Sequence, residues 1–418
     1  MIAQEYLQTK SLLMTDQQKQ SVASAIVNLT KNLLGAGMLS LPMAFSLTGD
    51  YRIGLFLLTL VSIMSGSTFI MLGHACRLTG ERTFRGLVQS LFGGRLVWLV
   101  DLTIAFNSFF ACLALLAVIG DFLSRSLTSY AGHAVSRVPC VALIGFLVIL
   151  PLCLLPRLES LKSFSAVGLI ASSYAIGYVI VDSIKCQPLA SPAEGTLALH
   201  ASTLKSWALF STCFLGHYNA PKFFSELAHP NQFTRFCAIS YTLVALVYVL
   251  FAIAGYHRFG DSVHGDVLES YTKVDGWLNA AWLSMGFGIT FTYPLVFSAL
   301  KEIFNERFRS SLSSNPNGSM IAPLIIVPLT ILIAAYSKDV STFNAIKGAS
   351  SATILGFILP PAIYIKAVSS HPSLLSTRRR ASFFWCRIVM YTGGILGLFS
   401  VGYLCLNAIS NKPLFGYS

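Results

Sequence analysis

Apolar residues fall along this chain in blocks of about 20, separated by short polar segments. A block of this length crosses roughly 30 Å of hydrocarbon as a single helix. The pattern therefore predicts an all-α polytopic membrane protein with about 11 transmembrane helices. The predicted segments are residues 22–46, 53–75, 97–123, 138–156, 162–184, 204–221, 236–256, 277–300, 320–336, 343–365 and 383–409.

No long linker or low-complexity run divides these segments, so we predict one transmembrane domain over residues 22–409. Residues 1–21 form a polar N-terminal tail and residues 410–418 a C-terminal tail. The N-terminal tail lacks the basic and apolar regions of a cleavable signal. We therefore expect the first helix to direct membrane insertion.

The composition agrees with a membrane protein and favours a lipid bilayer over nucleic acid as its partner. The chain is 54% hydrophobic and 11% charged, whereas soluble domains carry about 25% charged residues. The net charge of +12 comes from Lys and Arg in the short segments between apolar blocks, which disfavours nucleic acid and fits a lipid bilayer. These basic residues are about twice as frequent in loops that would lie inside if the N-terminus is cytoplasmic, which predicts that orientation.

The cysteines point to no cofactor or metal. There are nine, and they form neither a CxxC motif nor a Cys/His cluster with metal-ligand spacing. Most lie inside apolar blocks and are expected to be small core residues. Cys140 and Cys186 fall near the predicted outer side, where they are either free or paired with each other.

Residues 28–42 in the first segment contain the strongest sign of a broken helix. Gly35 and Gly37 flank an alanine, and Pro42 follows five residues later. Backbone groups freed in mid-membrane need partners, so an unwound stretch at this depth normally lines a cavity. The ends of the two half-helices would then suit a carboxylate and a cation. The alternative is that the glycines only allow close helix packing.

Lys31 favours the functional interpretation of this stretch. It lies roughly 14 Å along the first segment at 1.5 Å per residue. A cation at that depth costs about 2.5 kcal/mol or more unless it faces the interior of the bundle. Its ammonium group either occupies a site where a related transporter would bind sodium, or extends back to the membrane surface.

The sixth segment supplies a matching break. Residues 213–221 change from apolar to polar and end at Pro221. Paired interruptions in corresponding positions of two halves mark transporter binding sites. An odd number of helices per repeat inverts the second copy, so the two breaks would face each other. His217 either titrates near neutral pH or is a hydrogen-bonded core histidine.

The eighth segment contains a third candidate around Pro294. Thr290 and Thr292 precede this proline and either coordinate a cation or hydrogen-bond the backbone that the proline frees. We favour backbone repair for Thr290 and a site role for Thr292. Asn107 in the third segment faces the pathway or ties helices together.

At residues 31–42 (KNLLGAGMLSLP) the chain resembles the amino acid/auxin permease family. Residues 217–221 (HYNAP), followed by Glu226-Leu227, are similar to the family's sixth-helix region. The resemblance implies a LeuT-like fold of two inverted five-helix repeats plus one extra helix. It also implies an amino acid substrate held by the unwound parts of helices one and six.

The resemblance also implies roles for individual residues. In the sodium-coupled branch, an asparagine of helix one and a threonine of helix eight help to hold sodium. Thr292 matches that threonine, but Lys31 stands where the asparagine would be, which argues against sodium. The predicted ion or proton site comprises Lys31, His217 and Thr292. The predicted substrate-binding residues are Asn32, Gly35, Ala36, Gly37, Phe214, Gly216, His217, Tyr218 and Asn219.

The sequence therefore predicts a sodium-independent, proton-linked amino acid transporter that works by alternating access. Neutral substrates are favoured because no intramembrane Asp or Glu lies at the breaks. An enzyme is disfavoured because the chain lacks a nucleophile–base or His/Asp/Glu constellation. An amino-acid-sensing receptor and a carrier of another organic solute remain alternatives. The membrane is predicted to be the plasma membrane or a vacuolar or lysosomal membrane.

Overall fold

A computed structural model describes residues 19–155, 161–185, 200–308, 320–337, 339–371 and 377–410. Over these ranges the chain is helical, and its one β-like pairing is a single bridge between Gln20 and Leu227. An all-α fold is thus confirmed. Cys186 lies outside the described residues, so both alternatives for Cys140 and Cys186, free or paired, stay open.

The first half of the described chain contains three interrupted helices. Its elements are α2 (Val22–Leu33), η2 (Ala36–Ser40), α3 (Leu41–Ser46), α4 (Tyr51–Thr79), α5 (Phe84–Phe92), α6 (Gly94–Ala131), α7 (Arg137–Ile144), η3 (Gly145–Ile149), α8 (Leu150–Leu154), α9 (Leu161–Lys185), α10 (Thr203–Cys213), η4 (His217–Asn219) and α11 (Ala220–Glu226).

The second half contains longer helices and one irregular loop. Its elements are η5 (Pro230–Gln232), α12 (Phe233–Phe259), η6 (Gly260–Ser262), η7 (Val267–Ser270), α13 (Gly276–Arg307), α15 (Ile321–Tyr336), α16 (Val340–Lys347), η9 (Gly348–Ile358), α17 (Leu359–Ser369) and α18 (Thr377–Ile409).

Length and apolarity single out fewer membrane spans than the sequence pattern predicts. Within the described residues seven helices are long and apolar enough to cross a bilayer, and eight if α2 and the η2–α3 segment are one span bent by 51°. Broken and short helices, such as α10–α11 and α15, fall below that length. The count of eleven therefore stays a prediction, although each predicted segment coincides with a helix or a broken helix.

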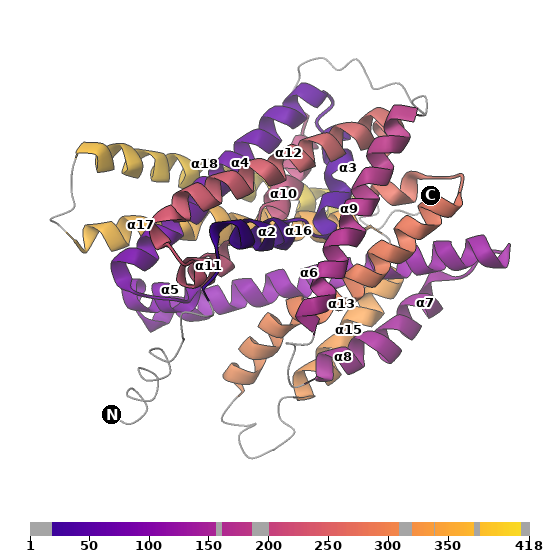
Figure 1. Ribbon diagram of the computed structural model, residues 1–418, viewed down its shortest axis with the longest axis horizontal. Coiled ribbons are helices and arrows are strands. Elements are labelled where there is room, and N and C mark those ends of the chain that lie inside the picture. Colours follow the sequence, from indigo (N-terminus) through magenta and orange to yellow (C-terminus); the bar gives the residue numbers. More distant parts are fainter. Residues whose placement is uncertain are drawn as a thin grey trace.

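The broken first helix lies in the middle of the molecule. Figure 1 shows α2 between α4 and α12 on one side and α6 and α13 on the other, with α17 and α18 at one edge. The outward surface is apolar: Leu398 is 72% exposed, and Ile184 is 79% exposed. Exposed apolar side chains on this scale indicate contact with lipid.

Candidate functional site

The breaks in the first and sixth predicted spans lie against each other. Helix α2 ends at Leu33 and resumes at Ala36, while α10 ends at Cys213 and resumes at His217. A Cβ added to Gly216 would lie 3.3 Å from Leu33 Cδ2, and one added to Gly37 would lie 3.7 Å from Cys213 Sγ. Small residues at these points therefore let the two unwound segments approach closely.

One side chain contacts the backbone at both breaks. The hydroxyl of Tyr248, in α12, is 2.5 Å from the Leu33 carbonyl oxygen and 3.1 Å from the Cys213 carbonyl oxygen. The Leu33 carbonyl also accepts from the Gly35 amide at 2.7 Å, so loss of the hydroxyl would weaken hydrogen bonding most at the Cys213 carbonyl. Sequence reasoning missed Tyr248, because a tyrosine inside an apolar block gives no sign of its distant partners.

Helix α16 closes a third side of the breaks. The Thr212 hydroxyl donates to the Asn344 carbonyl oxygen at 2.7 Å. A Cβ at Gly348 would lie only 1.8 Å from the Ala208 carbonyl oxygen, so α10 and the start of η9 touch through backbone. The close approach brings the side chains of α16 to the same place as the two breaks.

A cavity of about 820 Å³ opens at this junction. Its lining includes eight of the predicted site residues, together with the pathway candidate Asn107. The eight are Lys31, Asn32, Gly35, Ala36, Gly37, Tyr218, Asn219 and Thr292. The remaining three predicted site residues, Phe214, Gly216 and His217, belong to the same break but not to the lining.

His217 faces α4 instead of the cavity. Its Nε2 atom lies 2.8 Å from Thr68 Oγ1 and 3.1 Å from the Ser65 carbonyl oxygen. A carbonyl oxygen only accepts, so Nε2 carries the hydrogen of the Ser65 contact. The side chain is 1% exposed, and Nδ1 has no hydrogen-bond partner in the described part of the chain.

The two threonines of α13 differ in their position relative to the cavity. Thr292 lines the cavity and its hydroxyl donates to the Gly288 carbonyl oxygen at 3.0 Å. Thr290 lies outside the lining, and its hydroxyl donates to the Gly286 carbonyl oxygen at 2.7 Å. Both hydroxyls thus bond backbone one turn earlier in the helix that contains Pro294.

Two asparagines present unused polar atoms at the cavity. Asn107 Oδ1 and Asn344 Nδ2 are buried without a hydrogen-bond partner among the described residues, and both side chains line the cavity. One is an acceptor and the other a donor.

Charges are unevenly distributed over the cavity. The ammonium-bearing side chains of Lys31 and Lys347 line its part near the breaks. Carboxyl groups enter the lining at its other end, where Asp101 and Glu306 flank Arg85. The sequence did not single out Lys347 as a site residue, since only the packing of α16 against α10 brings it to the cavity.

Comparison with known proteins agrees with this geometry. The sequence model of the family described as transmembrane amino acid transporter protein matches residues 18–404. The human solute carrier family 38 member 8 is 28% identical over 378 residues, which cover 84% of this chain and 86% of that protein.

Two further relatives span a similar part of the chain. Vacuolar amino acid transporter 5 of Schizosaccharomyces pombe is 27% identical over 83% of this chain and 84% of its own length. The mouse putative sodium-coupled neutral amino acid transporter 11 is 23% identical over 91% of this chain and 85% of its own length. The chain belongs to the transmembrane amino acid transporter family, that is, to the amino acid/auxin permeases.

Proposed function

We propose that this transporter is independent of sodium, linked to protons and selective for neutral amino acids, and that it works by alternating access. The observation that supports this most strongly is the pair of lysines, Lys31 and Lys347, in the cavity wall next to the helix breaks. A LeuT-like arrangement of two inverted five-helix repeats would place the two breaks face to face, as they lie here.

In this proposal the substrate's carboxylate binds the backbone at Gly35–Gly37, and carbonyl groups near Gly216–Asn219 accept from its amino group. Asn107 Oδ1 and Asn344 Nδ2 add one acceptor and one donor at the same cavity. The carboxyl groups of the described lining lie at the far end of the cavity, where none would pair with a cationic substrate side chain. This arrangement favours neutral amino acids.

The lysines oppose a sodium ion. At 4 Å, two unit charges repel by about 4 kcal/mol in a partly desolvated protein site. The mouse relative is named for sodium coupling, and this chain departs from such coupling through Lys31. In our proposal the ammonium of Lys31 takes the place of the coupling ion, Thr292 lies beside it, and His217 is a candidate proton-sensitive group.

The proposed membrane location rests on a relative. The fission yeast relative is named as vacuolar, so we propose a vacuolar or lysosomal membrane or the plasma membrane, with a cytoplasmic N-terminus. Both kinds of membrane can supply a proton gradient.

Uptake of labelled amino acids into proteoliposomes tests the proposed function. We expect accumulation of neutral amino acids that an inward proton gradient stimulates and that sodium leaves unchanged. Binding without accumulation would instead identify a receptor. The absence of both binding and uptake for every amino acid would reject the substrate class.

Lys31→Asn tests the role of the lysine in coupling. We expect this variant to lose its dependence on the proton gradient, or to gain sodium sensitivity, because the substituted side chain offers an oxygen where the ammonium stood. Lys222→Asn is the control, since Lys222 lines the cavity but its side chain is 67% exposed. Unchanged pH dependence together with unchanged sodium indifference in Lys31→Asn would contradict the proposal.

A further inference from the structure

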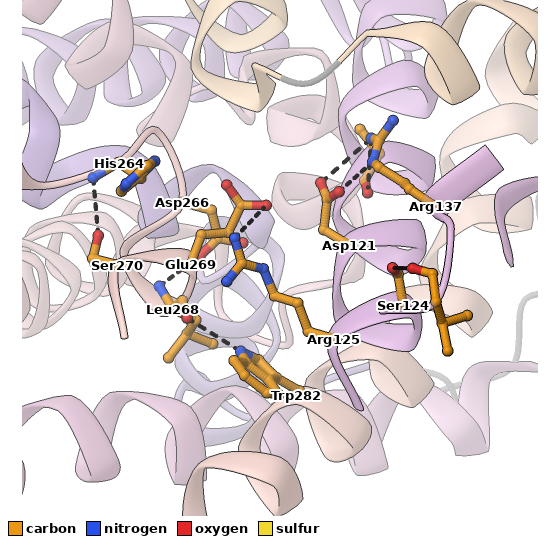
Figure 2. Close-up of polar contacts among 12 residues, drawn as sticks. Asp121, Ser124, Arg125, Arg137, His264, Asp266, Leu268, Glu269, Ser270 and Trp282 are labelled. Atoms are coloured by element: carbon orange, nitrogen blue, oxygen red, sulfur yellow. Dashed lines mark hydrogen bonds and ion pairs between the residues drawn. The ribbon is translucent and has the colours of Figure 1, made fainter. Parts of the chain in front are cut away.

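A second group of charged residues lies away from the cavity, on the predicted outer side. Asp121 and Arg125 come from α6, Arg137 from the start of α7, and Asp266 and Glu269 from the loop between α12 and α13. Figure 2 shows Glu269 reaching Arg125 while Arg137 reaches Asp121. We call these five residues the outer cluster, and none of them lines the cavity.

The outer cluster is mostly buried, and its most exposed side chain is that of Arg125, at 36%. Arg137 forms an ion pair with Asp121, and it donates to the Ala334 carbonyl oxygen at 2.6 Å and to the Ala335 carbonyl oxygen at 3.0 Å. Arg125 Nη2 lies 4.0 Å from Glu269 Oε1. The two guanidinium groups thus neutralise two of the three carboxylates.

The carboxylate of Asp266 has fewer hydrogen-bond partners than the arginines of the outer cluster. Asp266 is 1% exposed, and its Oδ1 accepts from the Leu268 amide at 2.9 Å. Its Oδ2 has no hydrogen-bond partner in the part of the chain that the structure describes. A buried carboxylate oxygen without a donor is costly, and protonation removes that cost.

The net charge of the outer cluster also favours the binding of one proton. With every group ionised, three carboxylates and two guanidinium groups leave the outer cluster with a net charge of −1. Binding one proton makes it neutral. A net charge in a buried site is strongly disfavoured, so the closed arrangement is expected to hold that proton.

The charged neighbours of the outer cluster are already paired or lie on its margin. Tyr271 packs on Tyr178 of α9, and near it Arg258 of α12 bonds Asp182 of α9 with 2.7 Å between Nε and Oδ2. Next to Gly265, Asp339 pairs with Lys205 at 3.6 Å. The other titratable groups of the loop and its ends are Asp261, His264, Lys273 and Asp275.

Burial acts on both loop carboxyls in the same direction. It raises the pKa of Asp266 to about 7, with the charge of Asp121 adding to the effect. Burial also raises the pKa of Glu269, as do the charges of Asp121 and Asp266 and a hydrogen bond with the Asp121 carboxyl group. Burial therefore favours the protonated form of both loop carboxyls.

The loop that carries these carboxyls closes the outer side of the broken helix. Element η7 packs against η2, and a Cβ added to Gly255 would lie 2.5 Å from Pro42 and 3.1 Å from Val267. Trp282 of α13 donates from Nε1 to the Leu268 carbonyl oxygen at 3.2 Å (Figure 2). Opening the outer side would therefore separate the loop from α6 and hydrate the cluster.

We propose that the outer cluster is a proton-binding site that holds the outer gate closed, with one proton taken from the outer solution shared by Asp266, Glu269 and Asp121. This inference deepens the proposed function, on whose alternating access it rests. When the gate opens, the proton returns to the outer solution and the three carboxylates become hydrated. One proton bound on closing changes the closed-to-open ratio about tenfold per pH unit where the open cluster is deprotonated.

Neutral isosteres of the two loop carboxyls test the site directly. Glu269→Gln or Asp266→Asn leaves two carboxylates and two arginines, so the cluster is neutral without a proton. In each single variant we expect the dependence of uptake on outer pH to flatten across about pH 5 to 8. The double variant carries a net charge of +1, and we expect it to close less readily than either single variant.

A second measurement needs no transport. We expect the unfolding temperature of the purified wild type to fall as the pH rises towards about 7, because a folded-state pKa above the unfolded one favours the protonated form. In each single variant, the unfolding temperature should no longer fall over this pH range. His264→Gln, at an exposed site on the same loop, should retain it.

The two measurements separate failure of this site from failure of the proposed function. If the wild type shows no proton-stimulated uptake while the single variants still lose the pH dependence of unfolding, the proton site stands and the coupling does not. If both single variants keep the wild-type dependence of unfolding and uptake on pH, the proton site is rejected. Loss of both dependences in His264→Gln would also reject it and assign the titration to that histidine.

Discussion

The ion pairs at the two ends of the molecule differ in their exposure to solvent. On the predicted inner side, Arg85 pairs with Asp101 and Glu306 at the cavity mouth, and the side chains of Arg85 and Glu306 are 41% and 53% exposed. On the predicted outer side, Arg137 and Asp121 are paired with side chains 14% and 8% exposed. The inner group meets solvent, whereas the outer cluster meets it chiefly at Arg125, whose side chain is 36% exposed.

This difference indicates which side of the transporter is closed. The lining of the cavity runs from the helix breaks to the inner ion pairs and includes none of the outer cluster. In the proposed alternating-access cycle, this arrangement corresponds to a state that is open to the predicted inner side. Exposed ion pairs contribute little and yield easily, while a buried network is costly to break.

Removal of Arg137 should give the largest effect. Arg137→Gln leaves Asp121 ionised in a buried site and leaves the carbonyls of Ala334 and Ala335 without their donor. We expect a loss of about 3–5 kcal/mol in the free energy of unfolding, which is the usual cost of breaking a buried pair. Thermal unfolding of the purified protein measures it.

The double variant Arg137→Gln/Asp121→Asn provides the control for this prediction. Because it removes both charges, it should recover part of the loss. A double variant no more stable than Arg137→Gln alone would show that the guanidinium stabilises α7 through the carbonyls and not through the ion pair.

Tyr248→Phe tests the helix breaks, which lie between the inner ion pairs and the outer cluster. Two buried carbonyl oxygens would lose their shared donor, and we expect a cost of about 1–3 kcal/mol in stability together with reduced uptake. The matched control is Tyr241→Phe in the same helix, whose buried hydroxyl has no partner among the described residues. Equal effects of the two substitutions would rule out a special role for the Tyr248 hydroxyl.

Arg85→Gln should give the smallest effect. We expect less than about 1 kcal/mol in stability, because the pair with Glu306 is exposed and screened by salt. Measurement of the unfolding temperature at low and high ionic strength checks this, and the difference from wild type should shrink at high salt. A loss as large as that in Arg137→Gln would overturn the contrast between the two ends.

Much of the candidate site was predictable because local sequence determines where a helix breaks. Gly35, Gly37 and Pro42 in one segment, and Gly216 and Pro221 in another, weaken a helix wherever it lies, and both breaks are observed. Lys31 was predicted to face the interior because of its depth along an apolar segment, and it lines the cavity. These inferences need only the residues adjacent in sequence and the energetic cost of placing a charge in lipid.

Contacts between distant segments were not predictable in the same way. Tyr248 is 35 residues from Cys213, and its hydroxyl bond to Leu33 spans 215 residues. His217 carries the polarity expected of a site residue but points towards α4, because a short 3₁₀ segment sets the direction of its side chain. Nothing in its sequence neighbourhood distinguishes the two directions.

The sequence by itself determined that this chain is an all-α membrane transporter of its family, where its helices are interrupted, and that a lysine lies near the interruption. These properties depend on apolar length, helix-breaking residues and a recognisable motif. The tertiary structure alone decided that Lys347 and Asn344 join the cavity, and that Asp121, Asp266 and Glu269 meet on the outer side. The reason is physical: burial and electrostatic interaction depend on distances in space, and residues on different helices acquire those distances only when the helices pack.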